Sequence, residues 1–310
     1  MKTVAILVPC YNEAEVLETT VSRLDDICRE IPDVSFSMVF VDDGSTDATL
    51  KTLLALRGRT GGPPVRIVQL SRNFGKESAL SAGLDCVTED ACIILDADLQ
   101  DPPETIREML AGWREGFDVV AVRRTDRSSD TEFKKRSAQL FYRIFNRFSD
   151  IKIPENVGDS RLIDRCVMDA LRKLPENTRF MKGLFAWVGF NTKIIDARRA
   201  PRLKGQSRLN TFRLALLAVD GLTSFSSSML RLWIYAGILA STFAFALGGY
   251  IILRVFVVGI ETPGYASLAV ILLFFSGIQM VGIGLIGEYV GRSFIEAKRR
   301  PAYVIKRIYE

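Results

Sequence analysis

Histidine is absent from this chain of 310 residues. Its absence excludes catalytic triads that contain histidine, histidine metal ligands and a histidine general base. Carboxylates, lysine, arginine and groups of a bound substrate remain to supply any acid–base or metal chemistry. The functional site must therefore be sought among clusters of Asp, Glu, Lys and Arg.

Cysteine is scarce as well. The five cysteines have neither the spacing of a zinc site nor that of a disulfide framework. They are Cys10, Cys28, Cys86, Cys92 and Cys166. This scattered distribution indicates that the cysteines are reduced and act as small apolar side chains in a cytosolic domain.

Charge is missing from two long stretches, at about 232–253 and 263–287. Each is long enough to cross a hydrocarbon core of roughly 30 Å as a helix. Arg231 precedes the first stretch and several Lys and Arg residues follow the second, whereas the connection between them is nearly neutral. By the positive-inside rule, we expect a transmembrane hairpin with both termini cytoplasmic.

The first part of the chain alternates between short apolar runs and segments of helical periodicity. The expected strands are 4–8, 36–41, 65–70, 92–95 and 118–122, and the expected helices are 14–31, 46–56, 78–87 and 103–114. Alternation of this kind predicts an α/β domain, with a Rossmann-like, mostly parallel sheet covered by helices on both faces.

Polar clusters follow three of the expected strands, over 9–13, 41–47 and 96–100. The carboxyl ends of parallel strands meet at one edge of a sheet, so we expect the clusters to converge. Carboxylates there can accept from a base or ribose, Tyr11 can stack, and Gly44 permits close backbone approach. Asp96 and Asp98 can share one Mg²⁺ or Mn²⁺ that bridges a diphosphate. Each cluster alone also fits turn and capping chemistry, but the three together favour a nucleotide site.

A series of motifs resembles the signature set of family-2 inverting glycosyltransferases of the GT-A fold. They are Pro-Cys-Tyr-Asn-Glu at 9–13, Val-Asp-Asp-Gly-Ser at 41–45, Ser-Arg-Asn-Phe-Gly-Lys at 71–76, Asp-Ala-Asp-Leu-Gln-Asp-Pro at 96–102, Gly-Asp-Ser-Arg-Leu at 158–162, Arg-Phe-Met-Lys-Gly-Leu at 179–184 and Arg-Leu-Lys-Gly-Gln-Ser-Arg at 202–208. More narrowly, the chain resembles polyprenyl-phosphate hexosyltransferases such as bactoprenol-phosphate glucosyltransferases and dolichol-phosphate mannose synthases. It departs from them at Ser160, where the family often has an aromatic residue, and at Arg208-Leu209, where it often has Lys-Tyr.

The resemblance implies transfer of a hexose, with inversion, from a nucleotide sugar to polyprenyl (undecaprenyl) phosphate at the cytoplasmic membrane face. UDP-glucose is the preferred donor, ahead of GDP-mannose, UDP-N-acetylglucosamine and an aminoarabinose donor. It further implies that Asp42 and Asp43 face the nucleoside, that Asp96 and Asp98 serve the metal, and that Asp159 is either a general base or an acceptor-positioning carboxylate. A homo-oligomer, such as a tetramer, is also implied.

The expected site residues follow from these motifs. The catalytic candidates are Asp159, Asp98 and Arg161; the donor-binding candidates are Pro9, Tyr11, Glu13, Asp42, Asp43, Lys76, Asp96, Ala97 and Gln100; the acceptor-phosphate candidates are Arg202 and Arg208; and the metal ligands are Asp96 and Asp98. An acceptor phosphate has a second pKa of about 6, so much of it is ionised at neutral pH and a strong base is not obligatory.

The expected domain organisation has four parts. They are a cytosolic GT-A domain over 1–208, a juxtamembrane interfacial helix over 209–230, two transmembrane helices within 231–290 and a basic cytosolic tail over 291–310. Within the first part, 132–148 has the aromatic and basic pattern of an interfacial helix. The basic stretch 198–213 raises the question of nucleic acid, but no recognised nucleic-acid fold surrounds it, and a lipid-linked phosphate is the preferred anion.

Two alternatives remain open at this stage. A processive polysaccharide synthase is disfavoured because the chain has no Gln-x-x-Arg-Trp motif and a single expected hairpin. A noncatalytic membrane scaffold or lipid translocation subunit is disfavoured by the intact carboxylate clusters. Turnover of a nucleotide-sugar donor distinguishes this second alternative from an enzyme.

Overall fold

The computed structural model describes residues 1–125, 143, 146–147, 151–154, 157–177, 179–197 and 264–310, with scattered positions between 233 and 257. The described elements are β1 (Lys2–Cys10), α1 (Leu17–Arg29), β2 (Val34–Asp42), α2 (Thr49–Arg57), β3 (Val65–Leu70), α3 (Lys76–Cys86), β4 (Ala91–Ile94), α4 (Thr105–Arg114), β5 (Val119–Arg124), β6 (Val157–Asp164), α6 (Arg165–Arg172), α7 (Met181–Trp187), β7 (Thr192–Ala197), α10 (Tyr265–Ala297) and β8 (Ile305–Tyr309).

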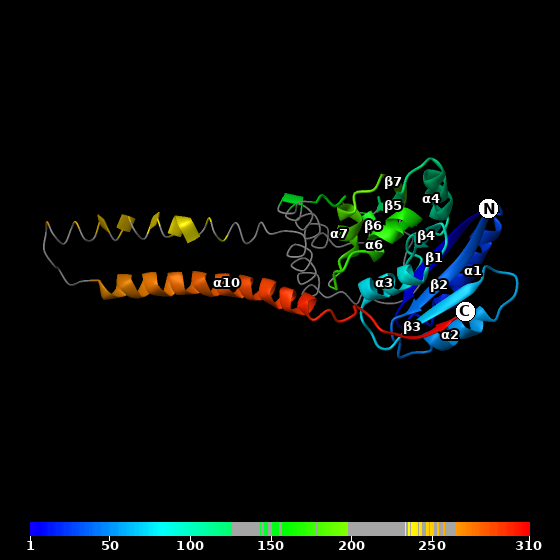
Figure 1. The fold of residues 1–310 in the computed structure, drawn as a ribbon, viewed down its shortest axis with the longest axis horizontal. Helices are drawn as coiled ribbons and strands as arrows, with labels where there is room; N and C mark the ends of the chain where they lie inside the picture. Colours follow the sequence, from blue (N-terminus) through cyan, green and yellow to red (C-terminus); the bar gives the residue numbers. More distant parts are fainter. Residues whose placement is uncertain are drawn as a thin grey trace.

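The strands form one 8-stranded sheet in the order β7-β5-β6-β4-β1-β2-β3-β8 (Figure 1). Four of the seven strand pairings described are parallel: β1–β2, β1–β4, β2–β3 and β5–β7. The other three, β3–β8, β4–β6 and β5–β6, are antiparallel. The expected α/β fold with a mostly parallel sheet is thus confirmed, and antiparallel strands enter it on both sides of the parallel centre.

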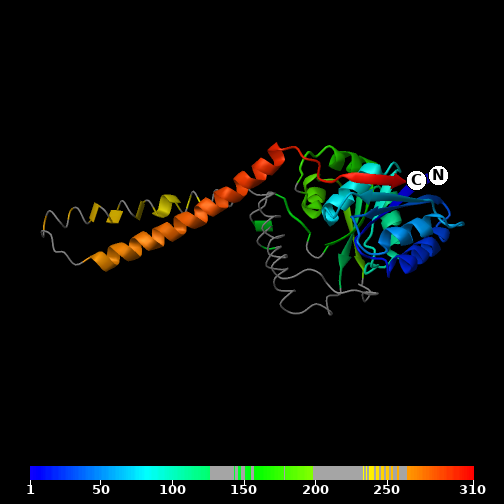
Figure 2. The ribbon, with the colours of Figure 1, turned by 90° about the horizontal axis from the view of Figure 1, so that it is seen from below.

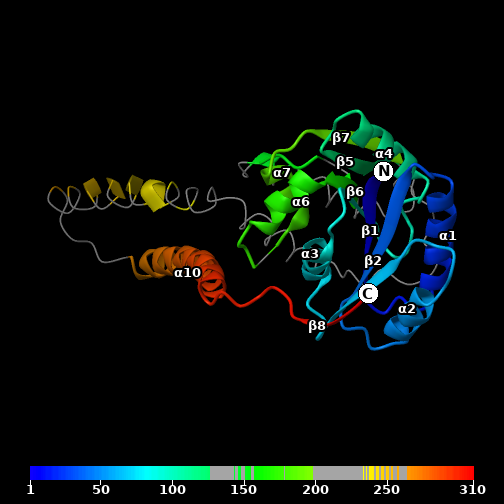
Figure 3. The ribbon, with the colours of Figure 1, turned by 45° about the vertical axis from the view of Figure 1, so that its right-hand side comes forward.

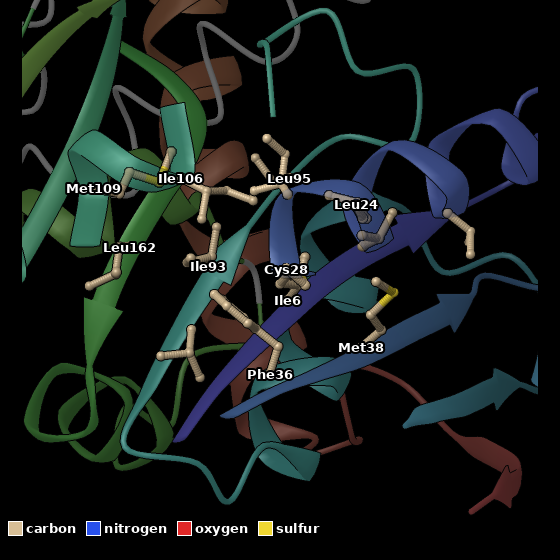
Figure 4. Close-up of a cluster of buried hydrophobic side chains, with 14 of the residues drawn as sticks. Ile6, Leu24, Cys28, Phe36, Met38, Ile93, Leu95, Ile106, Met109 and Leu162 are labelled. Atoms are coloured by element: carbon tan, nitrogen blue, oxygen red, sulfur yellow. The ribbon is translucent and has the colours of Figure 1, made fainter. Parts of the chain in front are cut away.

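The central strands are buried on both faces, which explains their continuous apolar sequences. In β1, Val4, Ile6 and Val8 pack in one core cluster with side chains of α1 and α4. Ala5 and Leu7 alternate with them and pack in a second cluster on the α3, α6 and α7 face. Figure 4 shows the first cluster, in which side chains of the sheet meet those of the covering helices. The period of two residues in a strand therefore places helices on both faces.

The last strand of the sheet is formed by the C-terminus. β8 pairs antiparallel with β3, and Figure 3 shows it beside β3 at the edge of the sheet. Ser71 N donates to Val304 O at 2.9 Å, and the Tyr303 hydroxyl donates to Asp85 of α3. The residues expected to be a basic tail, 291–310, are in the structure the end of α10, a short connection and this edge strand. Its charged Lys306 and Arg307 suit a sheet edge, because charge there discourages further strand pairing.

α10 extends away from the α/β domain, and its C-terminal end lies near that domain (Figures 1 and 2). Among the described residues, Phe274–Ala297 is the one segment long and apolar enough, by composition alone, to cross a membrane. The expected two-helix hairpin is therefore not supported by the described residues, which contain one such helix. The expected first span, 232–253, is described at scattered positions, and those positions are helical. At one described position, Trp233, the indole ring lies against Gly282 of α10, where a Cβ would collide with it.

Three other expectations lie largely or wholly outside the described residues. They are the interfacial helix at 132–148, the basic stretch at 198–213 and the juxtamembrane helix at 209–230. A smaller difference concerns the helix expected from residue 103. Pro102 and Pro103 instead form a turn whose carbonyl oxygens accept from Thr105 N and Ile106 N, each at 3.0 Å, so that α4 begins at Thr105.

α3 lies very close to the sheet at Gly83. A Cβ on this residue would collide with the Leu7 side chain and would lie 2.9 Å from Val41 Cγ2. Both neighbours are fully buried, so neither can move away freely. This close approach fixes the height of α3 above β1 and β2, and with it the position of Lys76 at the N-terminus of α3.

We expect Gly83→Val to lower the free energy of unfolding of the α/β domain by about 1–3 kcal/mol, because added methyl groups overpack a filled core. Gly58→Val is the matched control, since a Cβ there meets only Ala55 O at 3.6 Å, and we expect it to change stability by about 0.5 kcal/mol or less. Denaturation of the detergent-purified variants measures both. Equal stability of the two variants would contradict the close packing of α3.

Candidate active site

The polar clusters meet at the carboxyl edge of the sheet because β1 pairs with both β2 and β4. The ends of β1 and β2 are joined directly by a hydrogen bond from Asp43 N to Cys10 O at 2.9 Å. Asn12, in the left-handed region at φ 55°, accepts from Thr46 N through its side-chain oxygen at 2.8 Å. Glu13 N donates to Thr49 Oγ1 at 2.8 Å. The expected convergence of the first two clusters is thus present in the structure.

Asp42 and Asp43 are buried, with 1% and 3% of their surfaces exposed. Asp42 Oδ1 accepts from Ser45 N at 3.1 Å, and the Asp43 carboxylate accepts from Phe74 N at 2.8 Å and Gly75 N at 2.9 Å. Burial raises the pKa of Asp43, and the two backbone donors offset part of that rise. Asp43 therefore organises the loop that leads from β3 into α3, and Asp42 organises the turn that follows β2.

Gly44 lies between this loop and β2. Its φ of 66° is in the left-handed region, and a Cβ on it would collide with Arg72 and lie 2.6 Å from Asn73 N. Glycine is required here both for its φ and for the close approach. The sequence reasoning expected a close approach at Gly44, and the backbone that approaches it is that of residues 72–73.

The Asp96-Ala97-Asp98 segment follows β4 in a tight turn. Leu99 N donates to Asp96 O at 3.2 Å, and Leu99, which is buried, has a φ of 46°. A left-handed non-glycine residue stores strain, and such strain occurs often at functional sites. Thr20 Oγ1 of α1 donates to Ala97 O at 2.6 Å, and Asp98 Oδ1 accepts from Gln100 N at 3.2 Å. The backbone that presents Asp96 and Asp98 is thus fixed from several sides.

Asp101 and Ser160 form a buried contact that the sequence reasoning missed. The Ser160 hydroxyl donates to Asp101 Oδ2, and both residues are almost completely buried. This bond ties the loop after β4 to β6. Ser160 was noted only as a departure from the resembled family, and its pairing with Asp101 gives that departure a structural consequence.

Lys76 bridges two of the predicted site carboxylates. Its ammonium donates to Asp96 Oδ1 at 2.5 Å and to Asp159 Oδ2 at 2.6 Å. Burial lowers the pKa of Lys76, but the two carboxylates outweigh it and hold that pKa well above its usual range. Burial alone would raise the pKa of Asp159, but Lys76 and Lys182 hold it well below its usual range. Lys76 and Asp159 are therefore both charged at neutral pH.

Three residues of α7 contact this cluster, two through side chains and one through its backbone N–H. Lys182 Nζ lies 3.5 Å from Asp159 Oδ1. Met181 N donates to Glu77 Oε2 at 2.9 Å, and the Arg161 guanidinium lies 3.9 Å from the centre of the Phe185 ring. α7 was not expected as an element, although its first four residues lie in the motif at 179–184.

Arg161 is buried, with 4% of its surface exposed. Its Nη2 donates to Gly158 O at 2.9 Å and its Nε to Asp159 O at 3.3 Å. The structure thus places Arg161 behind Asp159. Arg202 and Arg208, the two candidates for the acceptor phosphate, lie outside the described residues.

The donor set fits a hard divalent cation that is completed by a substrate. No group of three or more His, Cys, Asp or Glu that could hold a metal ion occurs among the residues that the structure describes. Mg²⁺ is commonly bound through only one or two carboxylates, with phosphate oxygens and water as the other ligands. Asp96 and Asp98, on one fixed turn, are residues that could hold such an ion.

Comparison with known proteins identifies the family. The family model for glycosyl transferase family 2 matches residues 5–172, which include β1 to β6 and most of the site. The chain belongs to this family and is a glycosyltransferase.

Its relatives match over nearly the whole length. The prophage bactoprenol glucosyl transferase homolog of Escherichia coli (strain K12) is 43% identical over 305 residues, covering 98% of this chain and 99% of that protein. The bactoprenol glucosyl transferase of Shigella phage SfII is 42% identical over 304 residues, covering 98% and 97%. Among solved structures, mannosyl-3-phosphoglycerate synthase from Rubrobacter xylanophilus is 16% identical with a TM-score of 0.49, covering 76% of this chain and 75% of that one.

Glu77 makes the stability of the site depend on pH. Burial and then the charge of Asp159 raise the pKa of Glu77 to about 7, against the opposing effects of Met181 N, Lys76 and Lys182. A carboxyl whose folded-state pKa is raised stabilises the fold fully below its unfolded pKa and loses that contribution as pH rises through the folded one. We therefore expect Glu77→Gln, which keeps an acceptor for Met181 N, to gain stability relative to the wild type between pH 5 and pH 8.

Thermal unfolding at both pH values measures this gain. Glu18→Gln, at an exposed first-turn position of α1, is the control, and we expect its effect to be the same at both pH values. A difference between Glu77→Gln and wild type that does not change with pH would contradict the raised pKa.

Proposed function

We propose that this glycosyltransferase transfers a hexose, with inversion, from a nucleotide sugar to undecaprenyl phosphate at the cytoplasmic face of a bacterial inner membrane. The observation that supports it most is the similarity, at 42–43% identity across 97–99% of their length, to relatives named for glucosyl transfer to bactoprenol. The similarity extends over 98% of this chain, well beyond the residues that the family model matches. UDP-glucose is accordingly the proposed donor, with GDP-mannose, UDP-N-acetylglucosamine and an aminoarabinose donor as alternatives.

The donor is proposed to bind along the carboxyl ends of β1, β2 and β4. Tyr11 and Glu13 follow β1, Asp42 fixes the turn after β2, and Asp43 fixes the loop after β3, so that the nucleoside has a rigid site. The remaining donor candidates are Pro9, Lys76, Asp96, Ala97 and Gln100. The buried hydrogen bonds of Asp42 and Asp43 favour a supporting role for these two carboxylates.

Asp96 and Asp98 are proposed to hold Mg²⁺ or Mn²⁺ together with the donor diphosphate. A bound divalent cation supplies charge neutralisation as the diphosphate leaves. Lys76, at 2.5 Å from Asp96, adds a second cation beside the same group. This arrangement supports the proposal, because positive charge stabilises the negative charge that accumulates on a departing diphosphate.

Asp159 is proposed to orient cations and not to remove a proton. A general base works best with a pKa near the operating pH, whereas Lys76 and Lys182 hold the pKa of Asp159 well below its usual range. An ionised phosphate acceptor needs no such base. Arg161 supports the charge of Asp159 from behind, and Arg202 and Arg208 remain the proposed contacts to the lipid phosphate.

The sheet itself favours a two-helix membrane hairpin. β8 follows α10 in the chain and pairs with β3, which precedes it, so both ends of the membrane region must lie on the same side of the bilayer. An even number of crossings satisfies this condition, and α10 supplies one. The uncharged stretch at 232–253 is proposed as the other, with Trp233 against Gly282 as a described contact. Both termini are then cytoplasmic, and the small residues of α10 leave room for a homo-oligomer.

Transfer of radiolabel from a panel of nucleotide sugars to undecaprenyl phosphate tests the reaction. We expect organic-extractable, acid-labile label from UDP-glucose with the purified protein and Mg²⁺ or Mn²⁺, and its loss with a chelator. Failure of every donor under every metal condition would overturn the proposal and favour a noncatalytic scaffold.

The metal assignment has its own test. We expect Asp98→Asn to lower kcat by about 100-fold or more, since a cation stabilises the departing diphosphate by several kcal/mol. Asp26→Asn, which removes the same charge from an exposed position on α1, should leave kcat unchanged. A near-normal rate for Asp98→Asn would remove Asp98 from the metal site.

A further inference from the structure

Lys182 is a second cation at Asp159 that none of the site expectations used. Lys76 and Lys182 lie on opposite oxygens of this carboxylate, at 2.6 Å from Oδ2 and 3.5 Å from Oδ1. Lys76 also has Asp96 as a partner, at 2.5 Å. The contact of Lys182 is the longer one, so its ammonium is held less closely than that of Lys76.

Solvent and ligands can reach this ammonium. The side chain of Lys182 is 30% exposed and that of Asp159 is 29% exposed, whereas Arg161 behind them is 4% exposed. The ammonium of Lys182 can therefore contact an incoming anion while Asp159 stays paired with Lys76. A phosphate dianion provides more negative charge and more acceptor oxygens than one carboxylate.

The position of Lys182 separates it from the donor clusters. In the sheet order, β6 with Asp159 lies on one side of β4, and β1 and β2 with the expected nucleoside residues lie on the other. Asp96, after β4, lies between the two groups. Lys76 contacts Asp96, beside which the donor diphosphate is proposed to bind. Lys182 does not share this contact and lies at the other oxygen of Asp159.

The segment that leads into α7 is attached to the cytosolic end of α10. Asn177 N donates to the Glu296 carboxylate at 3.1 Å, and Asn177 Nδ2 donates to it at 3.3 Å. At the other end of α7, Trp187 is 55% exposed, and tryptophan is enriched at membrane surfaces. Lys182 therefore lies on a segment that is hydrogen-bonded to the end of the proposed membrane helix α10.

We propose that Lys182 binds the phosphate of the lipid acceptor and holds it opposite the donor diphosphate. This inference deepens the proposed function and rests on it. In the reaction an acceptor phosphate oxygen bonds to the anomeric carbon, the bond from that carbon to the diphosphate oxygen breaks, and its electron pair leaves with the nucleoside diphosphate. No proton has to be removed from the dianionic acceptor. Asp159 holds the ammonium in place before the acceptor arrives.

Steady-state kinetics of Lys182→Gln, Lys182→Arg and Lys173→Gln, with UDP-glucose and undecaprenyl phosphate in detergent, test this role. We expect Lys182→Gln to raise the KM for the lipid about 10-fold to 100-fold, as loss of a charged hydrogen bond does, and to leave the KM for UDP-glucose within about two-fold. Lys182→Arg keeps the cation and should restore most of the lipid affinity. Lys173→Gln removes the same charge from an exposed position at the end of α6 and should match the wild type.

The possible failures differ from one another. A raised KM for UDP-glucose with an unchanged KM for the lipid would assign Lys182 to the donor diphosphate and overturn the inference. A lower kcat or melting temperature with both KM values unchanged would reduce Lys182 to a support of Asp159, which also overturns it. Absence of lipid labelling by the wild type would refute the proposed function itself, and the inference with it.

Discussion

The carboxylate of Asp159, held between the ammonium groups of Lys76 and Lys182, is the interaction on which the geometry of the site depends. It joins β6, α3 and α7, and through Lys76 it extends to Asp96 after β4. These groups are partly exposed, so the pairs add little to stability. The pairs instead fix positions, because they bring charged side chains of β6, α3 and α7 together at one place in the site. Removal of one of these side chains would leave the charge of its partner uncompensated.

The carboxylates at the carboxyl edge of the sheet form two groups with different roles. Asp42, Asp43 and Asp101 are buried and accept hydrogen bonds from backbone N–H groups or a hydroxyl. Asp96 and Asp159 are more exposed and meet ammonium groups. The first group makes the loops rigid, and the second group is the one proposed to meet ligands. Preorganisation of this kind reduces the rearrangement that charge development would otherwise require.

The sequence predicted the first part of the fold well, because apolar runs buried on both faces are unambiguous. β3 has the expected bounds, Val65–Leu70, and the helices and strands up to β5 differ from expectation by a few residues. β6 was missed because polar residues at 158–161 interrupt its apolar pattern. β8 was missed because Lys306 and Arg307 are typical of a solvated tail, and only pairing with β3 makes them a strand.

The candidate site was predictable in its residues and less so in their roles. Asp96, Asp159 and Lys76 do lie together, as their motifs indicated. Whether an acid is structural or exposed depends on its partners, and the partners of Asp43 and Asp101 are distant in sequence. The same is true of Lys182, whose significance comes from a carboxylate 23 positions earlier that only the fold brings near it.

The edge strand β8 also constrains how the protein is made. Ribosomes synthesise the chain from its N-terminus, so β1 to β7 leave the ribosome before α10 and β8 do. Until β8 pairs with it, β3 is itself an open edge, able to pair with other chains. Closure of this edge must therefore follow synthesis of α10, and a variant without β8 would leave β3 exposed.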